Sequence, residues 1–319
     1  MDRCIESVLE SARGLGASDV VFKEDRKAIM RIRGELIESD VFVTKSHMDR
    51  FTAYLKPIGY VHEYLGGASA IDVSFEHQGR YRANCFSSMG KRCAVVRVIS
   101  EEIRSLDTLG LPDDLVDRVR ERKGLSLIVG KTGAGKSTTL AAITQGILLA
   151  EKAHIITLED PVEYRYRSSR GEVTQRELGT DFSSFEMGIT DALRQSPDYI
   201  VIGEIRTLMA LKAAITAAEA GHGILGTIHS IGAARTLTRM LSMFTEQEKE
   251  FVRYQLSSNL NFILSQKLNY MGKDAALDYE LMINSSSMEN TIREGRFNQI
   301  DNLILLGEKQ GMKRFRTKE

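Results

Sequence analysis

The sequence feature that most limits how this chain can fold is the stretch GKTGAGKS at residues 130–137. Its glycines, Lys136 and Ser137 fit the phosphate-loop pattern G-x-x-x-x-G-K-[ST] at every fixed position. Residues 125–129 before it are a short and mostly apolar run, and residues 138–150 after it have a helical pattern. A strand, a glycine-rich turn and a helix, in this order, are the context that the pattern requires. The stretch therefore predicts a binding site for a nucleoside triphosphate.

Each part of this stretch has an expected contact with the triphosphate. Glycines let the backbone curl so that successive N–H groups point at phosphate oxygens, and the start of the following helix adds its positive end. We expect Lys136 to reach the outer phosphates and the Ser137 hydroxyl to be a ligand of Mg²⁺. The predicted nucleotide-binding residues are Gly130, Lys131, Thr132, Gly133, Ala134, Gly135, Lys136, Ser137 and Thr138.

Two acidic positions follow predicted strands downstream of the phosphate loop. Residues 199–203 are a mostly apolar run that ends at Glu204, where a carboxylate can bind Mg²⁺ or orient its waters. Residues 159–163 form a second acidic cluster, in which Asp160 and Glu163 can face the γ-phosphate and hold the attacking water. A solvated turn is the alternative interpretation of this cluster.

Two histidines, His222 and His229, flank a predicted strand at residues 224–228. At the ends of a central strand, such histidines could contact the γ-phosphate. The alternative is that each is an ordinary core or surface residue. Metal binding by these histidines is not expected, because no partner ligands lie at metal-site spacing.

Length, charge and cysteine content limit the class of protein. A chain of 319 residues can form two domains, each with its own core. Lysine plus arginine and aspartate plus glutamate each number 43, so no overall field favours nucleic acid or anionic lipid. The three cysteines have no metal spacing, and the chain has no apolar run of about eighteen residues. We expect a cytoplasmic protein with reduced thiols that binds no nucleic acid and reaches a membrane only through protein partners.

The pattern of predicted elements changes near residue 104. Before it, helices at residues 4–15 and 45–55 accompany antiparallel hairpins, which favours a small α+β domain. After it, strands and helices alternate, as in a parallel sheet that is covered on both faces. The sequence therefore predicts an α+β domain at residues 1–104 and an α/β nucleotide-binding domain at residues 105–319.

In the second domain, we expect four strands in the parallel sheet and helices between them. The strands are predicted at residues 125–129, 154–158, 199–203 and 224–228, and the helices at residues 138–150, 185–195, 208–220 and 233–243. Residues 246–268 have a long amphipathic pattern that favours one or two helices. A last strand is expected at residues 277–283 and a last helix at residues 287–296.

Taken together, these motifs resemble the secretion ATPase superfamily, and most closely the pilus retraction ATPases of type IV pili. The resemblance extends over nearly the whole chain. The segments that carry it are GASD at residues 16–19, RYRANCF at 80–86, the phosphate loop at 130–138, EDPVE at 159–163, GEIR at 203–206, and GH at 221–222 with GTIH at 226–229. Three features depart from the pattern. Ser230, Ile231 and Gly232 follow His229 where the relatives usually have threonine and two small or polar residues, and Glu289 stands where the relatives have an arginine. The relatives usually continue past the segment at residues 310–312 with another amphipathic helix, whereas this sequence continues with seven mostly polar residues.

The resemblance implies a PAS-like N-terminal domain followed by a RecA-like ATPase domain, which assemble as a homohexamer and use ATP and Mg²⁺. It implies that Arg80, Arg82 and Arg97 act on the phosphates when the domains close, because guanidinium groups stay charged and bind several oxygens. The alternative interpretation is alternating outward charges on antiparallel strands. Glu163 and Glu204 are implied in catalysis, without deciding which of them activates water. Lys136 and His229 complete the predicted catalytic set.

The implied function is a hexameric, ATP-hydrolysing motor that powers pilus retraction and twitching motility. Such a motor acts through a pilus platform protein of the inner membrane, at which the cytoplasmic ring is peripheral. The alternatives are a type IV or conjugative secretion ATPase and a non-motor nucleotide switch. The two candidate catalytic carboxylates and the absence of the guanine-recognition motif Asn-Lys-x-Asp favour the ATPase over the switch.

Overall fold

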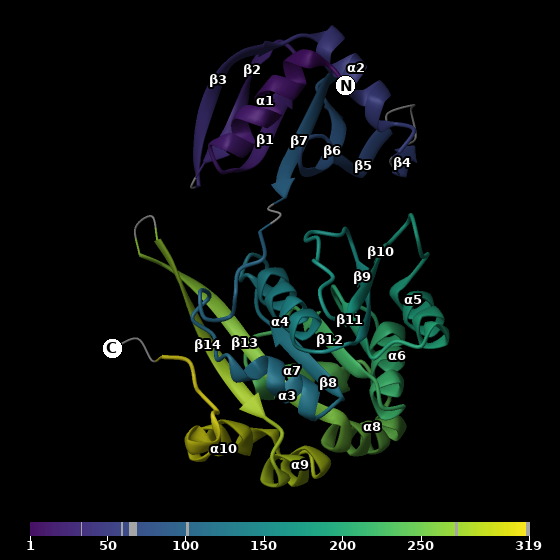
Figure 1. Ribbon diagram of the computed structural model, residues 1–319, viewed down its shortest axis with the longest axis vertical. Helices are drawn as coiled ribbons and strands as arrows, with labels where there is room; N and C mark the ends of the chain where they lie inside the picture. Colours follow the sequence, from purple (N-terminus) through teal and green to yellow (C-terminus); the bar gives the residue numbers. More distant parts are fainter. Residues whose placement is uncertain (33, 59, 64–68, 100–101, 272–273, 317–319) are drawn as a thin grey trace. The chain divides into compact units, whose positions relative to one another are not determined.

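The computed structural model describes residues 1–316, apart from residues 33, 59, 64–68, 100–101 and 272–273. The chain forms two compact units (Figure 1). The first unit contains Met1–Glu102 and Glu163–Arg165, and the second contains Ile103–Val162 and Tyr166–Glu319. The change from one unit to the other lies close to residue 104, where the pattern of predicted elements changes.

In its described residues, the first unit is a seven-stranded antiparallel sheet with two helices. The strands lie in the order β3-β2-β1-β7-β6-β5-β4. Their bounds are β1 (Ala17–Lys23), β2 (Arg26–Ile32), β3 (Glu35–Val43), β4 (Tyr60–Glu63), β5 (Ser69–Glu76), β6 (Arg80–Ser88) and β7 (Lys91–Ile99), and the helices are α1 (Arg3–Gly14) and α2 (Lys45–Leu55). The prediction of an α+β domain here is therefore confirmed.

Both helices of the first unit pack on one face of its sheet (Figure 1). Helix α2 begins after Thr44, whose hydroxyl accepts a hydrogen bond from the backbone N–H of His47. Below it, aromatic rings from the helix and the sheet form a chain of contacts, with centroids 5.9 Å apart for Phe51 and Phe75 and 5.3 Å apart for Phe75 and Tyr81. Aromatic contacts of this kind add to the burial of apolar area, so they fix the helices on this face.

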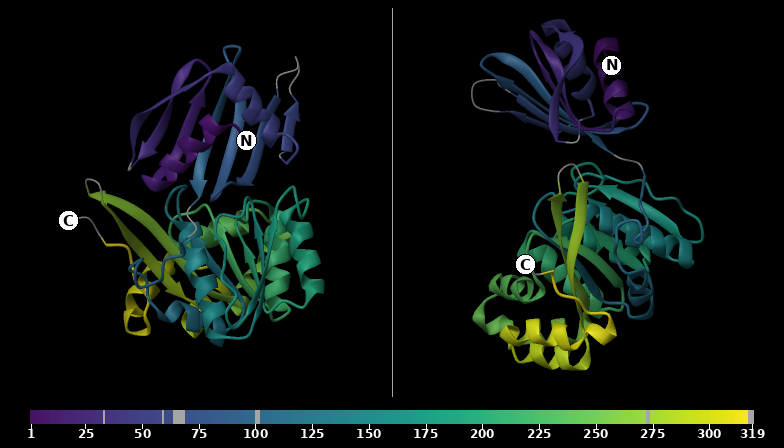
Figure 2. Two further views of the ribbon diagram at one scale, coloured as in Figure 1. Left: turned by 45° about the horizontal axis from the view of Figure 1, so that its top comes forward. Right: turned by 90° about the vertical axis from the view of Figure 1, so that its left-hand side faces the viewer.

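The second unit contains a seven-stranded sheet of order β10-β9-β11-β12-β8-β13-β14. All neighbouring strands are parallel except β14, which is antiparallel to β13. The strands are β8 (Leu125–Val129), β9 (His154–Glu159), β10 (Glu172–Glu177), β11 (Tyr199–Ile202), β12 (Gly223–Ile228), β13 (Leu260–Met271) and β14 (Asp274–Ile283). Figure 2 shows β13 and β14 as a long ribbon at one edge of this sheet.

Helices cover both faces of this sheet, as predicted for an α/β unit. Their bounds are α3 (Asp114–Glu121), α4 (Lys136–Ala150), α5 (Phe185–Ala192), α6 (Leu208–Glu219), α7 (Ala233–Ser242), α8 (Glu246–Asn259), α9 (Ser286–Arg293) and α10 (Ile300–Leu306). Apolar residues of α3 and α4 pack with Ile128 on one face, and those of α5 to α10 pack with Leu127 and Val129 on the other. None of the helices in the described part of the chain has the length and apolar character that a membrane span requires.

The prediction of helix throughout residues 246–268 is wrong. Helix α8 ends at Asn259, and strand β13 begins at the next residue. Phe262, Ile263 and Leu264 are all fully buried, because β13 lies between β8 and β14 with helices on both faces. A strand buried on both faces has a continuous apolar run, which periodicity cannot distinguish from a buried helix. Strands β4 and β10 and helix α10 were not predicted.

The burial of β13 can be tested by comparing the same change, leucine to alanine, at a buried position of β13 and at an exposed position elsewhere. Leu264→Ala removes a fully buried side chain, and we expect it to lower the free energy of unfolding by about 2 to 5 kcal/mol. Leu306→Ala removes a side chain that is 80% exposed, so a change of about 0.5 kcal/mol or less is expected. Urea denaturation followed by circular dichroism measures both. Equal effects of the two substitutions would contradict the position of β13 in the core.

Candidate nucleotide-binding site

The phosphate loop connects the end of β8 to the start of α4, and its backbone requires glycine. Gly133 and Gly135 have φ angles of +76° and +83°, in the left-handed region that glycine adopts without strain. At Gly130, a Cβ atom would lie 2.6 Å from the backbone oxygen of Gln266 on β13. The glycines of the motif are therefore explained by the loop conformation and by the close approach of a neighbouring strand.

The side chain of Lys136 lies within this loop. It is 8% exposed, and its Nζ donates hydrogen bonds of 3.1 Å to the carbonyl oxygens of Gly130 and Lys131. The same Nζ lies 3.2 Å from Nδ1 of His229, which follows strand β12. Burial of an ammonium group is costly unless it is hydrogen-bonded. These contacts therefore hold the charge where the phosphate-loop pattern predicts it.

Glu204 lies just beyond strand β11 and contacts the side chains of His229 and Arg206. Its Oε1 is 3.0 Å from Nε2 of His229, and its Oε2 is 2.7 Å from the guanidinium of Arg206. Burial alone would raise the pKa of this carboxyl group, but the hydrogen bond and charge of Arg206, together with the neighbouring His229 and the charge of Lys136, hold the pKa below its ordinary value. Glu204 is therefore an ionised carboxylate at neutral pH.

The ring of His229 joins Lys136 to Glu204. Because the ammonium can only donate to Nδ1, and the carboxylate can only accept from Nε2, the contacts fit a neutral ring with its proton on Nε2. Three residues predicted for the site, from the starts or ends of three different elements, are thus in direct contact. His222, the other histidine considered, lies 3.1 Å from the carbonyl oxygen of Ala217 beside the end of α6.

The end of β11 is fixed close to the neighbouring strands. A Cβ atom at Gly203 would lie 3.2 Å from the carbonyl oxygen of Leu158 on β9. The hydroxyl of Thr227 on β12 donates a 2.6 Å hydrogen bond to the Gly203 carbonyl oxygen. Glycine before Glu204 therefore allows β11 to end against β9, which places the carboxylate beside the phosphate loop.

The acidic cluster at residues 159–163 is divided by the fold. Glu159, at the end of β9, is 8% exposed and accepts hydrogen bonds from the hydroxyl of Thr157 (2.6 Å) and from Nε2 of Gln175 (3.1 Å). Asp160 lies 4.0 Å from Arg206, whereas Glu163 is grouped with the first unit. No role was predicted for Glu159, although its position as the last residue of a buried strand is a signal that the sequence contains.

The three predicted arginines each have an acidic partner within the first unit. Arg82 donates through Nε and a terminal nitrogen to both oxygens of Asp72, at 3.1 and 3.0 Å. Arg97 lies 3.3 Å from Asp19, and Arg80 lies 3.6 Å from its partner Glu76. Arg82 and Arg97 are direct neighbours across β6 and β7. Within this unit, the arginines are thus part of a row of alternating charges on the antiparallel sheet.

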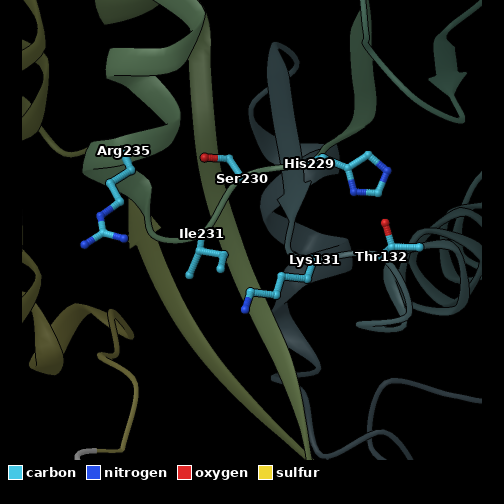
Figure 3. A pocket seen from close by; sticks show the side chains of 6 residues that line it. All are labelled: Lys131, Thr132, His229, Ser230, Ile231 and Arg235. Carbon is cyan, nitrogen blue, oxygen red and sulfur yellow. The ribbon is translucent and has the colours of Figure 1, made fainter.

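A pocket of about 620 Å³ lies beside the phosphate loop (Figure 3). The residues that line it are Lys131, Thr132, His229, Ser230, Ile231 and Arg235. Its volume lies in the range typical of small-molecule sites. The last three residues, on the loop after β12 and the first turn of α7, were not predicted as site residues.

Comparison with known proteins identifies the family. Residues 1–290 match the family described as type II/IV secretion system protein. The chain belongs to this family. It is an ATPase of this family, as its similarity to the relatives below shows.

Proteins named for twitching motility or pilus retraction are similar to the chain over most of its length. A twitching motility protein of Neisseria gonorrhoeae is 38% identical over 76% of this chain and 66% of its own. The type IV pilus retraction ATPase PilT of Pseudomonas aeruginosa is 38% identical over 76% of this chain and 71% of its own. The crystal structure of the pilus retraction motor PilT with bound ADP has a TM-score of 0.85 at 32% identity, over 98% of this chain and 95% of that one.

The charge of Glu204 can be tested through the pH dependence of ATP turnover. Arg206→Gln removes the group that holds the Glu204 pKa down, so burial will raise that pKa. If ionised Glu204 is required, a higher pKa leaves less of it ionised at acidic pH. The acidic limb of the kcat–pH profile will then move to higher pH.

The control for this experiment is Arg296→Gln, because Arg296 is paired with Glu294 beyond α9. Its profile should match that of the wild type. An acidic limb that does not move in Arg206→Gln would contradict the assigned interaction between Arg206 and Glu204.

Proposed function

We propose that this protein is an ATP-hydrolysing motor that powers the retraction of a type IV pilus. The observation that carries the proposal is the direct contact of Lys136, His229 and Glu204 at the phosphate loop. The similarity to pilus retraction ATPases along most of the chain favours pilus retraction over protein secretion as the function.

The reaction is the transfer of the γ-phosphoryl group of ATP to water. Water forms the new bond to phosphorus, the bond to the bridging oxygen of ADP breaks, and the water proton passes to a carboxylate. Lys136 neutralises the charge that develops on the phosphate oxygens. Glu204 and Glu163 are the two candidates for the carboxylate that accepts the proton. His229 couples Lys136, which binds the phosphates, to Glu204, since its ring contacts both of these charged side chains.

The donors beside the phosphate loop fit a magnesium ion. Mg²⁺ prefers hard oxygen ligands and is held in such sites by few protein groups. The hydroxyl of Ser137, in the first turn of α4, and the ionised carboxylate of Glu204 supply donors of this kind. When bound, the ion would add positive charge next to the outer phosphates, which complements that of Lys136.

The rest of the proposal concerns assembly. We infer that the chain works as a homohexamer on the cytoplasmic side of the inner membrane and acts on a platform protein of the pilus. In this assembly, Arg80, Arg82 and Arg97 serve as phosphate ligands during turnover. Their ion pairs, with Glu76, Asp72 and Asp19 respectively, are partly exposed, so exchange of these carboxylates for phosphate has a small cost.

The role of Lys136 can be tested by its removal. Lys136→Ala should abolish steady-state phosphate release, because no other side chain of the loop supplies a buried ammonium to the phosphates. The control is Lys152→Ala, which removes an exposed lysine of the same unit beyond α4. Full turnover by Lys136→Ala would overturn the site assignment.

The proposed cellular function predicts the phenotype of a deletion strain. Loss of a retraction motor should leave surplus surface pili and no twitching motility. The wild-type gene should restore twitching, and the Lys136→Ala gene should not. A strain that twitches normally but fails to secrete proteins would instead identify a secretion ATPase and contradict the proposal.

A further inference from the structure

The loop that carries His229 into the site is anchored to the β13–β14 ribbon. After His229, the chain passes through Ser230 and Ile231 to Gly232, which precedes α7. The backbone N–H of Gly232 donates a 2.8 Å hydrogen bond to the hydroxyl of Ser265. The next N–H, of Ala233, donates a 2.8 Å hydrogen bond to Oε1 of Glu280. Two consecutive backbone donors of the loop are thus held by side chains of the ribbon.

The two acceptors form one unit of the ribbon. Ser265 on β13 and Glu280 on β14 are direct register partners, so their side chains lie next to each other on the same face. Ser265 is fully buried and Glu280 is 6% exposed. Burial raises the pKa of Glu280, and the hydrogen bond from the Ala233 N–H at the start of α7 offsets this in part. Helix α7 has no side-chain cap of its own at Gly232, so Glu280 takes the place of that cap.

The same ribbon also contacts the phosphate loop. Gln266, the residue after Ser265, donates a 2.6 Å hydrogen bond from Nε2 to the carbonyl oxygen of Ala134. On the other side of the His229 loop, Arg239 of α7 donates to the carbonyl oxygen of His229. The backbone on both sides of the Lys136–His229 contact is therefore fixed by polar side chains, the buried Gln266 on one side and the exposed Arg239 on the other.

We propose that Glu280, with its partner Ser265, is a positioning residue for ATP turnover. It fixes the backbone between His229 and α7, so that the His229 ring reaches both Lys136 and Glu204. Glu280 acts through His229, because it contacts the backbone of the loop at Ala233. The inference rests on the proposed role of the Lys136–His229–Glu204 site.

Two substitutions at Glu280 separate the effect of losing the hydrogen-bond acceptor from the effect of losing the negative charge. Glu280→Ala removes the acceptor, and a displaced His229 should lower kcat by about tenfold to a hundredfold. The KM for ATP should change little, because the phosphate loop keeps its own contact with Gln266. Glu280→Gln keeps an oxygen that accepts from Ala233, so kcat should stay within about twofold of the wild type.

The matched control is Asp278→Ala. Asp278 lies two residues before Glu280 on the same strand and the same face, is also 6% exposed, and pairs with Lys267. The Asp278→Ala substitution should leave kcat unchanged. Circular dichroism and ADP binding establish that each variant is folded. If Glu280→Ala does not fold, Ser265→Ala tests the same loop and should lower kcat without changing the KM.

A double-mutant cycle with His229→Ala decides whether Glu280 acts through the histidine. In the His229→Ala background, Glu280→Ala should cause no further loss of kcat. A full additional loss would overturn the positioning role while leaving the site proposal intact. Unchanged kcat in Glu280→Ala alone would overturn it as well. Full turnover by His229→Ala would contradict both the site proposal and this inference.

Discussion

The site depends on one interaction, the neutral ring of His229 between the ammonium of Lys136 and the carboxylate of Glu204. Both charged groups are removed from most of the solvent, and a buried charge is stable only when it is well hydrogen-bonded. The ring satisfies both, because each of its nitrogens faces the group that it can pair with. A change at any one of the three residues therefore alters the environment of the other two.

The fold provides this contact because the strands that lead to the site are parallel and adjacent. Strand β8 leads into the phosphate loop, β12 leads into His229 and β11 leads into Glu204, in the spatial order β11-β12-β8. The carboxyl ends of parallel strands meet at one edge of a sheet, which is where ligands bind in open α/β sheets. The β13–β14 ribbon then supports the same edge from the side, through Gln266, Ser265 and Glu280.

The sequence predicted the parts of the site that depend on local patterns. The phosphate loop has a fixed spacing, and Glu204 and His229 follow apolar runs of strand length, so parallel pairing was enough to bring them together. It did not predict Ser265 or Glu280, because they lie on strands whose position depends on distant contacts. The pattern at residues 260–268 predicts helix, since a strand buried on both faces has no period-two pattern. Without β13, no argument could place a polar residue of that strand near the site.

The measurement that tests the central claim most directly is the equilibrium binding of ATP to the purified protein, with and without Mg²⁺, by calorimetry. The Lys136–His229–Glu204 arrangement predicts saturable binding that Mg²⁺ strengthens in the wild type. In Ser137→Ala, Mg²⁺ should strengthen binding less, because one oxygen ligand is lost. An absence of ATP binding by the folded wild-type protein in the presence of Mg²⁺ would contradict the account.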